Sequence, residues 1–187
     1  SIARRVSELR SFGRYLLRFD LVETDPFAYL PAPRHDRRLP GVLTEVETLE
    51  LLGAPDTTTP LGLRDRALLE TLYGGGLRVS EVVGLDVGNY DAVARTLRVH
   101  GKGDRDRTAL VGREAARWIA RYLESARPAL AAASGRGVSV VAVRAQPALF
   151  LNRWGGRLSV RSVQRTLAQH GAAVGLTGGI YRLAKEG

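Results

Sequence analysis

The hydrophobic pattern of the chain departs from helical spacing over one segment, and this segment limits the folds that the sequence can adopt. Between residues 89 and 111, the segment NYDAVARTLRVHGKGDRDRTALV alternates apolar and polar side chains around two turn sequences, YDAVA and GKGD. Alternation with a period of two is typical of strands that bury one face. The pattern predicts a meander of three antiparallel strands. Most other periodic segments have helical spacing, so we expect a mainly α, α+β fold with one small sheet.

Helical segments flank this meander on both sides. Apolar residues over 2–19 recur every three or four positions with arginines between them, which predicts an amphipathic helix with a basic outer face. The segment TEVE, residues 44–47, is a capping box that begins a further helix. Val46, Leu49 and Leu52 are expected to form the buried stripe of that helix. Further helices are predicted over 63–73, 79–83, 113–130 and 159–170.

The segment PAPRHDRRLP, residues 31–40, divides the chain. Its three prolines oppose regular structure, so a domain boundary is expected near residue 40. About 30 residues are too few to close a hydrophobic core alone. We therefore interpret residues 1–32 as the C-terminal part of a larger helical domain, residues 33–40 as a basic linker, and residues 41–187 as a second domain.

The net charge indicates the class of partner. The 28 Lys and Arg residues exceed the 19 Asp and Glu residues by 9, and the sequence pI is about 10.7. A polyanion such as nucleic acid is the first partner that this charge suggests, although a basic soluble protein without a nucleic-acid partner has the same composition. The chain has no cysteine and its three histidines lie far apart, so no disulfide or protein-built metal site is expected.

No membrane or export signal is visible in the sequence. The longest apolar runs, such as VSVVAV, are much shorter than a membrane-spanning helix, and the first residues have no signal-peptide pattern. We expect a cytoplasmic protein without a membrane partner.

Two basic residues stand in unusual local contexts. Arg78 follows three glycines in GGGLRVSEVVGL, and Glu81 lies three residues further on. An ion pair between Arg78 and Glu81 with a purely structural role would explain the arrangement. Lys102 lies between two glycines at the tip of the expected GKGD turn, where a flexible hairpin could direct its ammonium group away from the sheet. A solvated turn is the alternative interpretation.

Taken together, these segments resemble a known family. The stretch TPLGLRDRALLETLYGGGLRVSEVVGLDVGNYDAVARTLRVHGKGDRDR, followed by ALFLNRWGGRLSVRSVQRTLAQHGAAVGL, resembles the Xer-type tyrosine recombinases of the phage integrase superfamily. The resemblance runs nearly continuously from Ser1 to Leu176. It implies a tyrosine-recombinase catalytic domain with a small three-stranded antiparallel sheet in residues 41–187. It also implies that residues 1–32 belong to a helical, SAM-like core-binding domain.

The resemblance implies an activity and a set of catalytic residues. Recombinases of this family cleave and rejoin DNA strands at specific sites through a 3′-phosphotyrosine intermediate, so neither ATP nor Mg²⁺ nor another cofactor is expected. Arg78 matches the first catalytic arginine, and Glu81 matches the acidic residue that supports it. Lys102 matches the hairpin lysine that acts as general acid. Arginine can stabilise the charge on phosphate oxygens, and lysine can protonate the leaving 5′-oxygen.

The resemblance also implies partners and DNA contacts. Double-stranded DNA is the expected ligand, bound by a homo- or hetero-tetramer on two sites, with a cell-division DNA translocase as a further partner. Chromosome dimer resolution and DNA integration or excision are the expected processes. Arg161 is expected to enter the major groove from the start of the late helix, with Arg165 one turn on. Further DNA contacts are expected from Arg4, Arg34, Arg37, His100 and Arg105.

The family pattern stops after Leu176. A His-x-x-Arg motif and a later nucleophilic tyrosine are expected there, whereas the sequence reads TGGIYRLAKEG. We interpret Tyr181 as part of a structural helix rather than as the nucleophile, and the chain as incomplete at both ends, with the motif loop missing between Thr177 and Ile180. The 187-residue chain itself is expected to be inactive. The alternative is a DNA-binding accessory protein of the same ancestry that has lost its catalytic activity.

Overall fold

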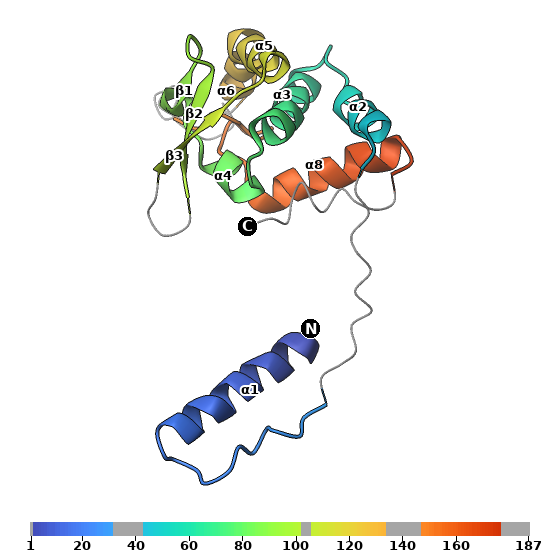
Figure 1. The fold of residues 1–187 in the computed structure, drawn as a ribbon. Coiled ribbons are helices and arrows are strands. Elements are labelled where there is room, and N and C mark those ends of the chain that lie inside the picture. The colour runs from blue at the N-terminus through green and yellow to red at the C-terminus, as the bar shows by residue number, and fades with distance from the viewer. Residues whose placement is uncertain (1, 32–42, 102–105, 134–146, 177–187) are drawn as a thin grey trace. The chain divides into compact units, whose positions relative to one another are not determined.

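The computed structural model describes residues 2–31, 43–101, 106–133 and 147–176. The chain forms two compact units, Ser1–Leu39 and Pro40–Gly187, and each is described by itself (Figure 1). In the first unit, α1 (Ile2–Arg18) confirms the predicted amphipathic helix. The segment after it is fixed to α1 by Arg10, whose Nη2 donates to the carbonyl oxygen of Leu30 at 2.7 Å.

The second unit begins with two capped helices. Thr44 and Glu47 form the predicted capping box at the start of α2 (Glu45–Gly53), with the Thr44 backbone N–H donating to Glu47 at 2.7 Å. In α3 (Pro60–Gly75), proline occupies the first turn and the Thr59 hydroxyl accepts from the Gly62 N–H at 3.0 Å. These side chains satisfy amide groups that have no partner inside their own helices.

The predicted buried stripe of α2 is wrong at Val46 and Leu49 and confirmed at Leu52. Val46 and Leu49 are 65% and 61% exposed, and the buried residues of the helix are Thr48, Leu51 and Leu52. Both sets follow helical spacing, so periodicity alone does not decide which face packs against α3. Burial of Thr48 is possible because its hydroxyl donates to the Thr44 carbonyl oxygen at 2.9 Å.

Gly62, in the first turn of α3, lies against the backbone of the loop that precedes the helix. A Cβ atom there would meet the backbone carbonyl of Asp56, at 2.6 Å from its carbon atom. We expect Gly62→Ala to lower the free energy of unfolding by about 1–3 kcal/mol, because backbone atoms must move to admit the methyl group. Urea denaturation followed by tryptophan fluorescence measures this loss. Gly53→Ala is the matched control, since its nearest neighbour lies 3.8 Å away; an equal loss in both variants would contradict the explanation.

The predicted three-stranded antiparallel sheet is present. β1 (Tyr90–Asp91), β2 (Thr96–His100) and β3 (Asp106–Leu110) pair in the order β1-β2-β3. In β2 the side chains of Leu97 and Val99 are fully buried, while Arg98 between them is exposed. The alternation in the sequence therefore corresponds to one buried face of the sheet.

The segments that follow the sheet in the chain are mainly helical. The predicted helix over 113–130 is divided into α5 (Arg113–Arg121), a π-helical turn at Tyr122–Ala126, and α6 (Arg127–Ala132), which has a proline in its first turn. The late helix α8 (Val160–Ala173) begins at Ser159, whose hydroxyl accepts from the Ser162 N–H at 3.1 Å. Figure 1 shows α3 among α5, α2 and α8, with the sheet beside α4.

The core lies between the helices and the buried face of the sheet. Its centre contains the rings of Tyr122 and Phe150, which stack with centroids 5.5 Å apart. The fully buried side chains around them come from α3, β2, α5 and the segment before α8: Leu68, Leu72, Leu97, Ile119, Leu149 and Leu151. This core fixes α4 (Val79–Gly84), a short helix that contacts both β2 and α8.

Two features are absent from the described ranges. No helix within them is long and apolar enough to span a membrane. Among the same residues, no group of three or more His, Asp or Glu side chains is arranged to hold a metal ion.

Candidate active site

Arg78 is positioned by the sharp turn between α3 and α4. α3 ends at Gly76, whose φ of 55° lies in the left-handed region that favours glycine. Leu77 is then buried in the core, and Arg78 occupies the position that caps α4. The backbone N–H of Arg78 donates to Glu81 Oε2 at 2.8 Å, which fixes the first turn of the helix. The glycines therefore allow an arginine to follow the buried Leu77 while 48% of its own side chain stays exposed.

Glu81 is a buried carboxylate with two arginine partners. Its side chain is 4% exposed; Oε1 accepts from Arg78 Nη1 at 3.3 Å, and Oε2 accepts from Arg107 Nη2 at 3.0 Å. Burial by itself raises the pKa of Glu81. The hydrogen bonds from the Arg78 backbone and the Arg107 side chain, with the charges of both arginines, outweigh burial and hold the pKa below its ordinary value. Glu81 is therefore ionised at neutral pH.

The two arginines give the site its positive charge. Arg78 and Arg107 are 48% and 45% exposed, and both contact the one carboxylate of Glu81. Two guanidinium groups against one carboxylate leave a net charge of about +1 in this cluster. Each guanidinium has more N–H donors than Glu81 uses, so the cluster can bind an anion such as a phosphate.

A cleft of about 110 Å³ adjoins Glu81 on the side of the sheet. Its lining residues come from α4, the segment after it, and strands β2 and β3: Ser80, Glu81, Gly84, Leu85, Asn89, Arg98, His100 and Asp106. Two of these elements contribute to the candidate site, since Arg78 caps α4 and β3 contains Arg107.

His100 and Asp106 lie opposite each other at the ends of β2 and β3, where the hairpin begins. Nδ1 of His100 forms a hydrogen bond with the Asp106 carboxylate. The sequence predicted His100 as a DNA contact and gave no indication of this pairing. Its contact with DNA stays a prediction. Lys102 and Arg105, which belong to the intervening residues, lie outside the described residues.

The other predicted DNA contacts are distributed over both units. Arg161 and Arg165 are exposed on α8, four residues apart and therefore on one side of the helix. Arg4 is exposed on α1 and pairs with Glu8 at 2.9 Å. Arg34, Arg37 and Tyr181 lie outside the described residues. The structure thus brings Arg78 and Glu81 together, and it does not test the remaining assignments.

Arg157 supports α4 from a distant part of the sequence. Its Nη1 donates to the carbonyl oxygens of Val83 at 2.9 Å and Leu85 at 3.0 Å, and its Nη2 pairs with the Asp86 carboxylate. The last carbonyl groups of a helix have no partner within the helix, so these bonds stabilise the C-terminal end of α4. No local pattern in the sequence indicates the role of Arg157, because its partners lie more than 70 positions away.

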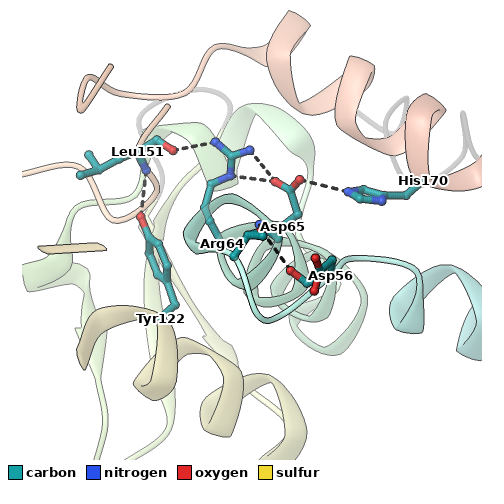
Figure 2. Close-up of polar contacts among 8 residues, drawn as sticks. Asp56, Arg64, Asp65, Tyr122, Leu151 and His170 are labelled. Carbon is teal, nitrogen blue, oxygen red and sulfur yellow. Dashed lines mark hydrogen bonds and ion pairs between the residues drawn. The ribbon is translucent and has the colours of Figure 1, made fainter. Parts of the chain in front are cut away.

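A second polar cluster connects α3 with α8 and with the segment before α8 (Figure 2). Arg64 donates to Asp65 at 2.7 Å and to the carbonyl oxygen of Leu151 at 2.9 Å, and Asp65 contacts His170 Nε2 at 3.0 Å. The hydroxyl of Tyr122 accepts from the Leu151 N–H at 3.0 Å, and burial raises the pKa of Tyr122 to about 12. Tyr122 is therefore a structural, un-ionised residue. The sequence did not predict this cluster.

Comparison with known proteins identifies close sequence relatives. Residues 41–183 match the family profile described as "Phage integrase family". The tyrosine recombinase XerC of Pelotomaculum thermopropionicum is 45% identical over 176 residues, which are 94% of this chain and 56% of the relative. The tyrosine recombinase XerD of Lacticaseibacillus casei is 38% identical, with coverage of 94% and 57%. The chain thus spans a little over half the length of these relatives, and the resemblance to Xer-type tyrosine recombinases is confirmed.

Solved structures share the fold. The Tn1549 transposon integrase, solved in complex with a circular intermediate DNA, gives a TM-score of 0.70 at 14% identity and covers 93% of this chain and 58% of the integrase. The XerA recombinase gives a TM-score of 0.61 at 18% identity, with coverage of 98% and 59%. The predicted fold class, mainly helical with one small antiparallel sheet, is confirmed by these likenesses.

Proposed function

The chain belongs to the phage integrase family, and from this membership and the geometry of α4 we propose that it is part of a site-specific DNA recombinase. In the proposed reaction, a tyrosine attacks a DNA phosphate, a 3′-phosphotyrosine forms, and the 5′-hydroxyl of the leaving strand departs. Attack by a 5′-hydroxyl on the phosphotyrosine then reforms the phosphodiester and releases the tyrosine. The bond energy is kept in the intermediate, so the proposed cycle uses no ATP.

The observation that carries this proposal is the arrangement of Arg78 on Glu81. Phosphoryl transfer depends on positive groups fixed near the phosphate oxygens before the reaction begins. Arg78 meets this requirement because its backbone is fixed by α4 and its half-exposed guanidinium is anchored on a buried carboxylate. In the proposed mechanism, Arg78 binds the non-bridging oxygens of the scissile phosphate and Glu81 orients it. Lys102 protonates the leaving 5′-oxygen.

Several basic residues would bind the DNA backbone around the cleaved phosphate. Such contacts position a duplex and make its affinity dependent on salt. In the proposal, residues 1–32 belong to a core-binding domain that residues 33–40 link to the catalytic domain of residues 41–187. The proposed contacts, in this linker and on both sides of it, are Arg4, Arg34, Arg37, His100, Arg105, Arg161 and Arg165.

Arg161 is the proposed sequence-reading residue. It is exposed in the first turn of α8, and an arginine in that position can donate two hydrogen bonds to guanine in the major groove. Arg161→Ala should weaken binding to the specific site by about 1–3 kcal/mol and remove the base preference at one position. Fluorescence anisotropy with a set of single-base-pair variants measures this. Arg165→Ala serves as the comparison, and an equal loss on random DNA in the Arg161 variant would indicate a phosphate contact only.

The biological setting is proposed from the similarity to XerC and XerD proteins. We propose that the complete protein acts in the cytoplasm as a homo- or hetero-tetramer on two DNA sites. Chromosome dimer resolution before cell division, with a DNA translocase as regulator, is the proposed process. DNA integration or excision uses the same chemistry.

Covalent capture tests the proposed activity without a target sequence chosen in advance. The protein expressed from its complete reading frame is incubated with fragmented genomic DNA of its source in EDTA and without ATP, denatured, and the protein-linked strands are sequenced. We expect one or a few recurring sites. DNA that is bound but never linked would instead support the inactive accessory protein, and linkage spread evenly over the genome would contradict site specificity.

A further inference from the structure

The carboxylate of Glu81 joins two parts of the candidate site that are distant in sequence. Glu81 belongs to α4, which begins after Arg78, whereas Arg107 belongs to β3, the strand that follows the residues containing Lys102. The Arg107–Glu81 contact, at 3.0 Å, spans 26 residues. It therefore connects α4, the helix that follows Arg78, with strand β3.

From this geometry we infer that Arg107 is a positioning residue for DNA cleavage, which fixes the Glu81 carboxylate and through it the guanidinium of Arg78. The inference rests on the proposed function. Arg107 was not identified from the sequence, where only the spacing of Arg78 and Glu81 was visible. Nothing in the sequence of β3 distinguishes Arg107 from the other arginines of the hairpin.

The two contacts of Glu81 differ in geometry. The Arg78 guanidinium lies 3.3 Å from Oε1, near the upper limit for a hydrogen bond, whereas the Arg107 guanidinium lies 3.0 Å from Oε2. The two arginine side chains thus contact different oxygens of the same carboxylate. Because Arg107 contacts Oε2, it fixes the carboxylate without competing with the Arg78 guanidinium for Oε1.

Arg107 gives the buried Glu81 carboxylate a second cationic partner, which matters when Arg78 binds a phosphate. A carboxylate that is 4% exposed is strongly destabilised when it has no cationic partner. If Arg78 alone neutralised Glu81, a phosphate that drew Arg78 away would leave that charge unpaired. Because Arg107 remains on Oε2, Glu81 keeps an ion pair while Arg78 engages the phosphate. Arg107 therefore keeps the carboxylate fixed and paired while further N–H groups of Arg78 bind the phosphate.

A titration of Glu81 tests the positioning contact in the 187-residue chain. Carbon-13 NMR of labelled glutamate carboxyl groups gives the pKa of Glu81, assigned by its disappearance in Glu81→Gln. We expect Arg107→Gln to raise this pKa clearly, because a hydrogen bond and a positive charge are lost, and Arg107→Lys to raise it less. Arg113→Gln is the control, since Arg113 is an exposed arginine at the start of α5, and this variant should leave the pKa unchanged. A Glu81 pKa that is the same in wild type and Arg107→Gln would overturn the inference.

Cleavage kinetics test the consequence for function in the protein from the complete reading frame. On pre-bound DNA, Arg107→Gln should slow single-turnover cleavage roughly 10- to 100-fold with little change in DNA Kd, and Arg107→Lys should recover part of the rate. If the wild-type protein cleaves DNA and Arg107→Gln cleaves it equally fast, the inference about Arg107 is overturned and the proposed function is not. A wild-type protein that cleaves no DNA overturns the proposed function, and the titration then decides whether Arg107 positions Glu81.

Discussion

Replacing Arg78 with alanine is expected to slow DNA strand cleavage by about 10²–10³-fold, the usual effect of removing one pre-oriented donor from a developing negative charge. The turn after Gly76 and the first turn of α4 fix the backbone of Arg78. The buried Glu81 carboxylate anchors its guanidinium. DNA affinity should change little, because many other basic side chains contribute phosphate contacts. Single-turnover cleavage of a nicked duplex that traps the covalent intermediate measures the rate separately from binding.

Two further variants define the cause of this loss. Arg78→Lys keeps the charge but not the planar pair of donors, so we expect it to remain strongly impaired. Arg113→Ala removes an exposed arginine at the start of α5 and should cleave at nearly the wild-type rate. Cleavage by Arg78→Ala close to the wild-type rate would show that Arg78 is not a ligand of the scissile phosphate.

The largest expected loss of stability follows removal of Arg64. Its side chain is 8% exposed and contacts both Asp65 and the carbonyl oxygen of Leu151. Arg64→Met keeps most of the volume, but it leaves the Asp65 carboxylate with its hydrogen bond to His170 and leaves the Leu151 carbonyl without its donor. Removing one partner of a buried ion pair typically costs about 3–5 kcal/mol, and we expect a loss of that size in the free energy of unfolding.

Urea unfolding of the 187-residue chain measures this loss. Both tryptophans, Trp118 and Trp154, belong to the second unit, so their fluorescence reports on the unit that contains Arg64. Arg113→Met is the control, and this exposed substitution should change the free energy of unfolding by less than about 0.5 kcal/mol. A midpoint that Arg64→Met leaves unchanged would contradict a structural role for the cluster with Asp65 and His170.

Local patterns in the sequence predicted the elements of the fold well. The alternation around Leu97 and Val99 predicted the sheet, because only a half-buried strand gives a period of two. Thr44 and Ser159 were predicted as caps, because a side-chain oxygen next to unpaired amide groups satisfies them locally. These interactions involve residues close in sequence, so the sequence itself contains the information.

Interactions between distant residues were not predictable in the same way. The buried face of α2 was wrongly assigned because Val46 and Leu49 have the same periodicity as Thr48 and Leu51, and only the packing against α3 decides between them. For the candidate site, Arg78 and Glu81 could be paired from their spacing of three residues. Arg107 could not, because its contact depends on the pairing of β2 with β3. The chain is rich in arginine, so composition does not distinguish the few that have structural partners.

The chemical identity of the protein–DNA link is the most direct test of the proposed phosphoryl transfer. The captured adduct of the protein from the complete reading frame is trimmed with nuclease, digested with protease and examined by mass spectrometry. We predict one peptide that carries a nucleotide joined through its 3′-phosphate to a tyrosine side chain, and a yield that falls sharply in Arg78→Ala. A link through serine, a link to the 5′ end of the DNA, or the absence of any adduct would contradict it.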